Sequence, residues 1–481
     1  MYLTESPHEK GVLYAGSDDG LVHITKDGGV NWTNITPPNL AEGIINSIEV
    51  SPHSPATAYI AVMRYKFMDL KPYIFKTSDY GQTWTKITNG ITNKHTFVRV
   101  VREDKKQKGL LYAGTETGLY VSLDDGQNWQ KFQLNLPIVP INDLTIQDND
   151  LVAATAGRSF WILDDVGAIQ NSFDISGKLK IVQPKPTYRI FGGSQDKPIP
   201  GLGQNPKSGV TIDYYLPKKL DSTELKLEIL KDGEVIRSYT NQKPKGFKSW
   251  PGGPSKPAIL GSKKGYNRFT WDFRTEALPS IEKVFVFGNA AGHRVGPGSY
   301  TLRLTLEDEI VATSATVLAN PKIDAAVTDY TAQQEVLSTI SSTVKEIHNA
   351  VNQMRSAKAQ LKNYKKLLKG NEAVKELLEK GEAIEKRITI WEENLIQPKQ
   401  KTFQDVINFN NQLNADLLHL KGFVDVAEPK ITKGAKERLQ DLLADWNKYE
   451  QEKNTIVNVE MSVFNDLYKS LNLPALLLND D

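Results

Sequence analysis

Short runs of alternating apolar and polar residues dominate residues 1–170, and a spacing of two is typical of half-buried β-strands. The runs come in pairs joined by polar turns, which predicts antiparallel hairpins. The pairs are Gly11–Ser17 with Gly20–Thr25, Ala58–Val62 with Ile74–Thr77, Gly109–Thr115 with Gly118–Ser122, and Ile141–Ile146 with Leu151–Thr155. The second pair has a longer connection, Met63–Tyr73. We therefore expect about four small sheets, the first lacking most of its inner strand and the last irregular.

Residues 171–325 keep the strand texture but lose the repeat. The expected strands are Val210–Leu216, Glu224–Leu230, Glu234–Tyr239, Tyr266–Phe273, Lys283–Phe287, Ser299–Glu307 and Ile310–Leu318. Lys231-Asp232-Gly233 signals a hairpin turn, and closely spaced Pro and Gly residues predict a long loop at 243–264. Seven short strands are typical of an immunoglobulin-like β-sandwich.

After Asp329 the apolar spacing changes to three and four, which predicts amphipathic helices. The first helix ends at Gly370-Asn371, the second runs from Val374 to Leu395, the third opens at a capping box, Thr402-x-x-Asp405, and the fourth spans about 433–470. We expect residues 326–481 to form an antiparallel four-helix bundle whose apolar stripes are its core.

The most specific motif is Ser/Thr-x-Asp-x-Gly-x-x-Trp, which occurs three times, at Thr25–Trp32, Thr77–Trp84 and Ser122–Trp129. The aspartates lie 52 residues (27 to 79) and 45 residues (79 to 124) apart, a spacing that suits one four-stranded propeller blade per repeat. Asp can accept hydrogen bonds from the turn, Gly supplies a positive φ, and Trp packs beneath the turn. The residues given this structural role are Asp27, Gly29, Trp32, Asp79, Gly81, Trp84, Asp124, Gly126 and Trp129.

Together with LLYAGTETGLYVSLDDGQNW and GRSFWILDDV, these motifs resemble the bacterial Asp-box (BNR-repeat) propeller proteins related to the sortilin luminal domain, which are often labelled glycosyl hydrolases. The likeness is strongest over residues 1–170. It continues into Gly203–Val210 and Asn267–Arg274, which look like the sandwich that follows the propeller in that family. Ala156 departs from the family, which usually has a polar residue there. Since such propellers have more blades, the resemblance implies the C-terminal portion of a longer, secreted or periplasmic protein.

Taken together, the fold class is multidomain, β plus α: propeller blades in 1–170, a sandwich in 171–325 and a helical bundle in 326–481. The net charge is +2, which gives no electrostatic reason to expect nucleic acid or an acidic membrane as a partner. With no cysteine, disulfides and thiolate chemistry are excluded. The histidines are scattered without metal-ligand spacing, so no metal and no cofactor are expected. Residues 1–10 are not a signal peptide, and no apolar run is long enough to span a membrane.

Candidate site residues follow from blade topology. The Asp-box turns join third to fourth strands, so the turns joining second to third strands gather at the opposite face. That face collects two sets of side chains, the candidate acids Glu116, Asp18 and Asp19 and the candidate ligand-binding residues Arg64, Asp69 and Arg158.

Two functions remain open. The preferred one is a non-catalytic binding or scaffolding protein whose propeller face receives a peptide, protein or glycan. The alternative is glycoside hydrolysis by the complete propeller, because two carboxylates on one face are what that reaction needs. An open arc of blades would expose sheet faces and invite self-association, covering by the sandwich, or a different partner. Self-association through the open arc or through the helical bundle is the outcome to test.

Overall fold

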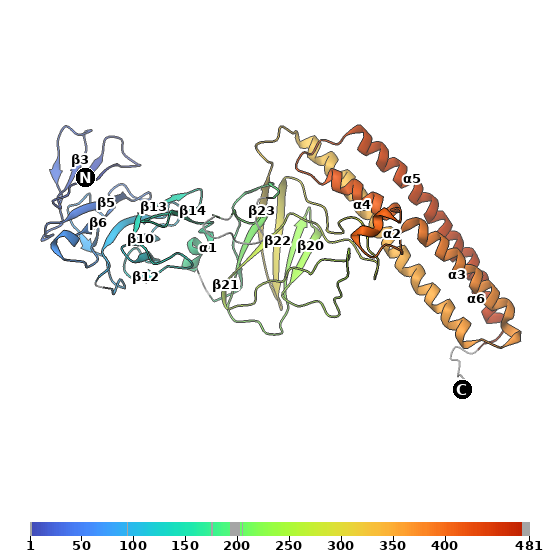
Figure 1. The fold of residues 1–481 in the computed structure, drawn as a ribbon. Helices are drawn as coiled ribbons and strands as arrows, with labels where there is room; N and C mark the ends of the chain where they lie inside the picture. The colour runs from blue at the N-terminus through green and yellow to red at the C-terminus, as the bar shows by residue number, and fades with distance from the viewer. Residues whose placement is uncertain (1, 94, 175–176, 193–202, 204, 474–481) are drawn as a thin grey trace. The chain divides into compact units, whose positions relative to one another are not determined.

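The computed structural model describes residues 2–93, 95–174, 177–192, 203 and 205–473. It divides into two compact units, Met1–Lys178 and Leu179–Asp481. The first unit is built of antiparallel sheets, and the second contains further sheets followed by the C-terminal helices (Figure 1).

The first unit contains four sheets in chain order, each made of consecutive strands. The first sheet is β1 (Tyr2–Glu5), β2 (Leu13–Gly16), β3 (Val22–Thr25) and β4 (Thr33–Asn34); the second is β5 (Ile44–Val50), β6 (Ala58–Met63), β7 (Ile74–Thr77) and β8 (Thr85–Lys86). The third is β9 (Val98–Glu103), β10 (Leu111–Thr115), β11 (Gly118–Ser122) and β12 (Gln130–Lys131), and the fourth is β13 (Ile141–Gln147), β14 (Asp150–Thr155) and β15 (Phe160–Leu163). The four expected sheets are therefore present, and the fourth has three strands. The first retains a short inner strand, β1, which the sequence pattern had largely missed.

Successive inner strands contact one another, β1 with β5, β5 with β9 and β9 with β13. Apolar side chains of neighbouring sheets fill the space between them. Tyr14 and Val22 of the first sheet share a core with Ile48 of the second, and Tyr112 of the third shares one with Leu144 of the fourth. The described strands do not form a closed propeller. A short helix, α1 (Gly167–Gln170), and a 3-10 turn, η2 (Asn171–Asp174), follow the last sheet.

In the second unit, two sheets share one apolar core. One is made of β16 (Lys180–Ile181), β18 (Val210–Leu216) and β21 (Gly265–Trp271), in that order. The other has the order β17 (Thr187–Tyr188), β23 (Glu309–Leu318), β22 (Gly298–Leu306), β19 (Leu225–Lys231) and β20 (Glu234–Thr240), with β17 parallel to β23. Six of the seven expected strands are present within one or two residues of their predicted ends. Gln204, in the segment that resembles the family sandwich, lies outside the described residues.

The seventh expected strand, Lys283–Phe287, is wrong, because this segment forms no strand. The backbone carbonyls around it are taken by side chains instead of by a β-ladder. His348 bonds the carbonyl of Pro279 at 2.6 Å, and Arg355 bonds that of Glu282 at 3.2 Å. Its valines, Val284 and Val286, pack in the core of the helices, which the alternation of the sequence alone does not reveal.

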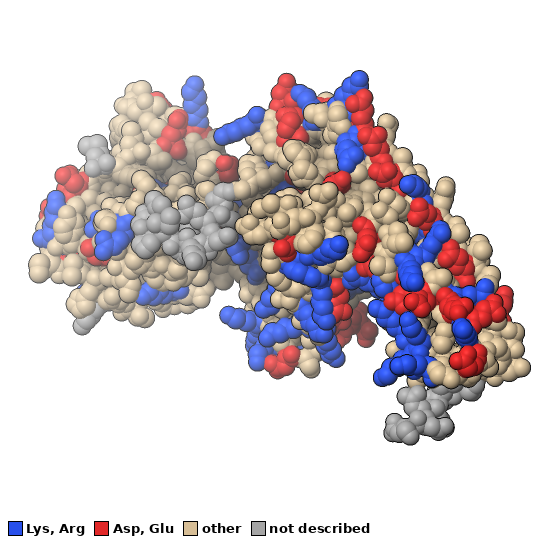
Figure 2. All heavy atoms as spheres, turned by 45° about the vertical axis from the view of Figure 1, so that its right-hand side comes forward, with Lys and Arg blue, Asp and Glu red and all other residues tan. Residues whose placement is uncertain are grey.

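The helices are α2 (Val327–Leu367), α3 (Lys375–Leu395), α4 (Leu413–Val424), α5 (Lys433–Thr455) and α6 (Met461–Ser470), with a π-helical turn, η5 (Ile456–Glu460), joining the last two and a 3-10 turn, η3 (Glu372–Val374), preceding α3. Long helices run side by side in Figure 1, and Leu337, Leu377 and Leu442 lie in their common core. Acidic and basic side chains are interspersed over the face of the helices seen in Figure 2. Ion pairs join neighbouring helices, as between Lys362 of α2 and Glu385 of α3.

The expected start of the third helix at Thr402 is also wrong. Asp405 does accept hydrogen bonds from the backbone of Lys401 and Thr402, so the capping geometry is present. It opens only a 3-10 turn, η4 (Phe403–Ile407), and α4 begins at Leu413. Phe403 and Ile407 are exposed, so this turn buries too little apolar surface to extend as a helix.

Candidate functional site

The three Asp-box turns lie between the third and fourth strands of their sheets, where the sequence placed them. In each turn the carboxylate is fully occupied by its own loop. Asp79 accepts hydrogen bonds from the Thr77 hydroxyl at 2.7 Å and from the amide and hydroxyl of Thr83 at 2.9 and 2.6 Å. Asp27 and Asp124 accept the equivalent bonds from Thr25 with Asn31 and from Ser122 with Asn128.

These bonds favour the charged carboxylate. The amide of Asn31 and the hydroxyl of Thr25 lower the pKa of Asp27 to about 2, and the hydroxyl and amide of Thr83 lower that of Asp79 to about 2. A carboxylate that is ionised at neutral pH and already bonded within its own loop suits turn closure.

The glycine and tryptophan of the motif connect one sheet to the preceding one. The indole of Trp84 donates to the Ile35 carbonyl at 2.7 Å, and that of Trp129 donates to the Ile87 carbonyl at 2.8 Å. Ile35 and Ile87 follow the last strands of the first and second sheets. The first copy has no such neighbour in the described chain: Trp32 bonds the carbonyl of Gly29 in its own turn at 3.1 Å and is 41% exposed.

The opposite turns hold the candidate site residues, and their lengths differ. The connection between the second and third strands is ten residues in the second sheet (64–73), against five in the first (17–21), two in the third (116–117) and four in the fourth (156–159). The long connection contains a 3-10 turn, η1 (Tyr65–Phe67), followed by Met68 with a φ of 56°. The turn thus lifts three apolar side chains, Tyr65, Phe67 and Met68, into solvent, with Met68 87% exposed.

An ion pair braces the base of this long connection. Arg64 pairs with Asp69, and Arg64 also donates to the Glu42 carbonyl at 3.0 Å. Asp69 accepts a further hydrogen bond from the Tyr73 hydroxyl at 2.7 Å. Burial opposes ionisation of Asp69, but the bonds from Tyr73 and from the amide of Lys71, with the charge of Arg64, outweigh it and hold its pKa below the usual value.

The long connection reaches the turn of the third sheet through stacked rings. Tyr65 stacks on Phe97 with ring centroids 5.5 Å apart, and the guanidinium of Arg99 lies over Phe97 at 5.2 Å. Arg99 then forms an ion pair with Glu116, at 2.6 Å from Nη2 to Oε2 and 2.8 Å from Nε. We call Tyr65, Phe67, Met68, Arg99 and Glu116 the loop-face patch.

The other candidates lie in the remaining turns. Asp18 and Asp19 are exposed, and Asp19 accepts a hydrogen bond from the Ser17 hydroxyl that lowers its pKa. Arg158 is exposed beside Gly157, and its guanidinium donates to the Gly157 carbonyl at 3.0 Å.

One cluster on the inner strands was not found from sequence. The guanidinium of Arg102, on β9 of the third sheet, contacts the other three sheets. It donates to the Tyr2 hydroxyl at 3.1 Å, the Ser47 hydroxyl at 2.9 Å, the Leu144 carbonyl at 2.9 Å and Asp143 at 2.7 Å, and it lies 3.5 Å from Glu49. The sequence shows only a single arginine within a predicted β-strand. Its partners lie as far as 100 residues away, so nothing near it in the sequence indicates the cluster.

Burial raises the pKa of Glu49 to about 7, although Arg102 and the amide of Glu103 act in the opposite direction. Glu49 and Arg102 are both largely covered, with side chains 22% and 13% exposed. The cluster therefore ties the inner strands together and contains one carboxyl group that titrates near neutral pH.

No group of three or more His, Cys, Asp or Glu side chains within the described ranges is placed to hold a metal ion. None of the helices in the part of the chain that the structure describes is both long and apolar enough to cross a membrane.

No protein family and no curated protein sequence matches the chain. Solved structures similar in part include YCF48 bound to D1 peptide (19% identity, 34% of this chain and 50% of that chain, TM-score 0.27). Others are the GH74 xyloglucanase from Xanthomonas campestris (14%, 69% and 46%, 0.28) and YCF48 from Cyanidioschyzon merolae (15%, 64% and 93%, 0.27). The chain spans about half the length of the first two. Likeness at this level leaves the function to be argued from the residues themselves.

Proposed function

We propose that the chain is a non-catalytic binding protein and that the loop-face patch receives a peptide or a segment of a partner protein through its apolar side chains. The observation that carries this proposal is the long second-to-third connection, which holds Tyr65, Phe67 and Met68 in solvent on a braced turn. Aromatic residues and Met are enriched in protein interfaces, where their area contributes most of the binding energy.

The bracing of the patch supports recognition. The Arg64–Asp69 pair fixes the turn at its base, and the stack of Tyr65 on Phe97 fixes one of its aromatic rings. A surface ordered before binding loses less conformational entropy when a ligand arrives. Beside the rings, Arg99 and Glu116 offer a cation and a carboxylate, 26% and 32% exposed, to polar groups of a bound peptide.

The state of the carboxylates speaks against hydrolysis by these residues. A glycosidase needs a carboxylic acid whose pKa is raised, paired with an ionised carboxylate across the sugar. The pKa shifts of Asp19 and Asp69 go the other way, and Glu116 is held by Arg99 in a two-bond ion pair. Glycoside hydrolysis is therefore the alternative function that the experiment must distinguish from peptide binding.

The test is selection of peptides from a random dodecapeptide display library on the full chain. The site variant replaces Tyr65, Phe67 and Met68 by Ser, and the matched control is Val30→Ser, which alters another exposed apolar residue on an Asp-box turn. We expect selected peptides to bind the site variant at least about tenfold more weakly, as loss of an interface anchor does, and the control unchanged. In parallel, reducing-sugar release from a panel of polysaccharides is measured with the chain and with Glu116→Gln.

Peptides that bind both variants equally well would contradict the proposal. Sugar release that Glu116→Gln abolishes would replace it with glycoside hydrolysis.

We also propose, on the resemblance of the Asp-box motifs alone, that the protein works outside the cytoplasm, which cell fractionation tests. The expected self-association would use β15, the outermost strand of the fourth sheet, where Phe160 and Ile162 are 73% and 60% exposed. Sedimentation of the chain and of Phe160→Lys would test it, with a dimer lost in the variant as the expected result.

A further inference from the structure

The second unit contains a pocket of about 710 Å³ between the loop 285–289 and helix α4. Such a volume lies within the range of about 300–1,000 Å³ found for small-molecule sites. Sequence reasoning assigned nothing here, because Lys283–Phe287 was expected to be a strand and α4 to begin earlier.

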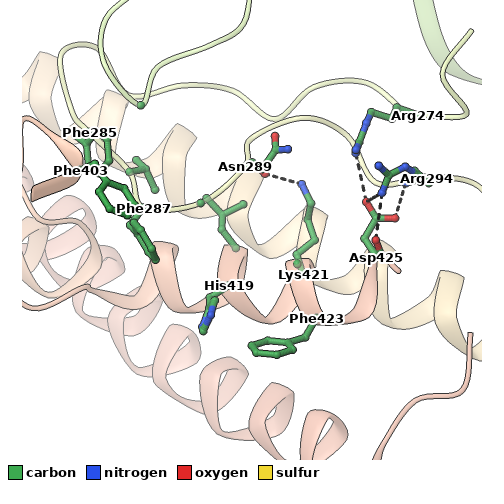
Figure 3. A pocket seen from close by; sticks show the side chains of 15 residues that line it. Arg274, Phe285, Phe287, Asn289, Arg294, Phe403, His419, Lys421, Phe423 and Asp425 are labelled. Atoms are coloured by element: carbon green, nitrogen blue, oxygen red, sulfur yellow. Dashed lines mark hydrogen bonds and ion pairs between the residues drawn. The ribbon is translucent and has the colours of Figure 1, made fainter. Parts of the chain in front are cut away.

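The two ends of the pocket differ in chemistry (Figure 3). Phe285, Phe287 and Phe403 gather at one end, with the rings of Phe287 and Phe403 5.4 Å apart. Arg274 and Arg294 lie at the other end around the carboxylate of Asp425 (Figure 3). The pocket therefore has an apolar end and a cationic end.

The wall between the ends is held by Lys421. Its ammonium group donates to the carbonyls of Asn289, at 2.8 Å, and Ala291, and the residue is only 3% exposed. Gly288 lets the loop approach α4 closely, because a Cβ there would come within 2.7 Å of the Leu418 side chain. The loop and the helix are thus fixed against each other.

Positive charge is in excess among the residues that line the pocket. Arg274, Arg294 and Lys421 carry three positive charges, and Asp425 is the one carboxylate among these lining residues. Asp425, whose side chain is 6% exposed, lies 3.3 Å from Arg274 and 3.5 Å from Arg294 and is shared by both guanidinium groups. Arg274 also lies 3.5 Å from the carboxylate of Asp272, which is half-exposed and does not line the pocket, so three cations face two carboxylates at this end. An additional anion at this end would bring the charge closer to balance.

The ionisation of the cations agrees with this geometry. Burial lowers the pKa of Lys421 to about 8, and Asp425 only partly offsets this while Arg274 and Arg294 add to it. Burial and the repulsion of Arg274 lower the pKa of Arg294, and Asp425 and Asp272 only partly offset this. Burial is the largest cause of both shifts, so each reports a cation that is shielded from water.

We propose that this pocket binds a small amphipathic organic anion, with a carboxylate or similar acidic head against Arg274 and Arg294 and an alkyl or aryl body against Phe285, Phe287 and Phe403. Guanidinium groups form charge-assisted hydrogen bonds with carboxylates, and their planar geometry suits paired contacts. The aromatic end gains by covering the exposed ring of Phe403. The site is separate from the loop-face patch and does not depend on the function proposed for it.

Isothermal titration of the full chain with four probes tests the proposal: decanoate, decan-1-ol, decyltrimethylammonium and acetate. We expect decanoate to bind at least about tenfold more tightly than the alcohol or the cation, as charge-assisted bonds imply, and acetate alone to bind weakly because it lacks the apolar body. A further titration with 4-phenylbutyrate distinguishes an aryl from an alkyl body. Equal binding of decanoate and decan-1-ol, or no binding of decanoate, would overturn the proposal.

Variants locate the site. Arg294→Met should weaken decanoate about tenfold, whereas Arg303→Met, which removes a half-exposed arginine from β22, should not change it. Phe287→Ala should weaken decanoate and leave acetate as it was, and Phe247→Ala, in the loop 243–264, is its control. If Arg294→Met does not fold, Phe287→Ala and the four probes on the unaltered chain still decide the matter. Decanoate binding that neither variant changes would place the ligand elsewhere and refute the inference.

Discussion

Substituting Ala for the glycine of each Asp box should give unequal losses of stability, although the motif is the same. All three glycines have positive φ, 99° at Gly29, 87° at Gly81 and 85° at Gly126. A side chain in this backbone conformation costs about 1–2 kcal/mol at each position. That part of the loss is common to all three.

The second part depends on the preceding sheet. A Cβ at Gly81 would lie 2.6 Å from the Ile35 side chain, and one at Gly126 would lie 2.5 Å from that of Ile87. At Gly29 the nearest atoms belong to its own Trp32, at 3.9 Å. Overpacking of this kind costs about 1–3 kcal/mol. Gly81→Ala and Gly126→Ala should therefore lose about 2–5 kcal/mol, against about 1–2 kcal/mol for Gly29→Ala.

Native-state hydrogen exchange read by mass spectrometry is the suitable assay, because a chain of two units need not unfold in one step. Peptides covering β7 and β11 report the opening free energy of the second and third sheets, and a peptide covering β3 reports the first. Equal losses of stability in the three variants would show that the glycines serve only their own turns. That result would refute the close packing of Gly81 and Gly126 against the preceding sheet.

Three further outcomes are expected. Trp129→Phe should destabilise the third sheet by about 1–3 kcal/mol, because it leaves a buried carbonyl unpaired. Trp32→Phe should destabilise the first sheet by about 0.5 kcal/mol or less, and hydrogen exchange measures both losses. Equal losses would contradict the idea that the indole of Trp129 stabilises the contact with the preceding sheet. Because the folded-state pKa of Glu49, about 7, lies above its unfolded value, its contribution to stability is complete below that unfolded value and is lost as pH rises through about 7. The urea midpoint of the first unit should fall as pH rises through about 7 in the unaltered chain and should not do so in Glu49→Gln. If the midpoints of the two proteins changed with pH in the same way, Glu49 would not be the cause. Gln333→Leu should destabilise the second unit by about 2–4 kcal/mol, because the fully buried amide bonds a buried guanidinium and two backbone carbonyls. The control is Glu335→Ala, which changes an exposed neighbour and should alter stability little; thermal unfolding measures both.

Sequence reasoning succeeded where a signal is local. The Asp-box turns depend on residues within about eight positions, so their hydrogen bonds follow from the motif, and the alternating runs located nearly all strands. The capping box at Thr402 was also read correctly as a cap. Its consequence was wrong, because the length of a helix depends on what its apolar face can bury, and that is decided elsewhere in the chain.

Interactions between distant residues could not be predicted. Arg102 gathers partners from three other inner strands, and the phenylalanines at the apolar end of the pocket come from a loop and from a turn more than 100 residues later. Each of these residues is ordinary in its own segment. Of the candidate site residues, Glu116 is part of the loop-face patch now proposed. The apolar part of the patch was missed because the long connection was treated as a source of charges.

Large apolar side chains of the first unit are exposed for two different reasons, and this difference supports the loop-face patch as the proposed site. Trp32 is exposed in a motif whose other copies pack their indole against a preceding sheet, so its exposure follows from its place in the series. Phe67 and Met68 are exposed in a connection that is longer than its three counterparts. The repeat does not explain their exposure. An ion pair and a ring stack hold the extra residues in place with their apolar side chains in water, which is unfavourable. A bound partner would cover this apolar surface and so gain free energy. For this reason we place the proposed peptide site at the long connection and not at the exposed tryptophan.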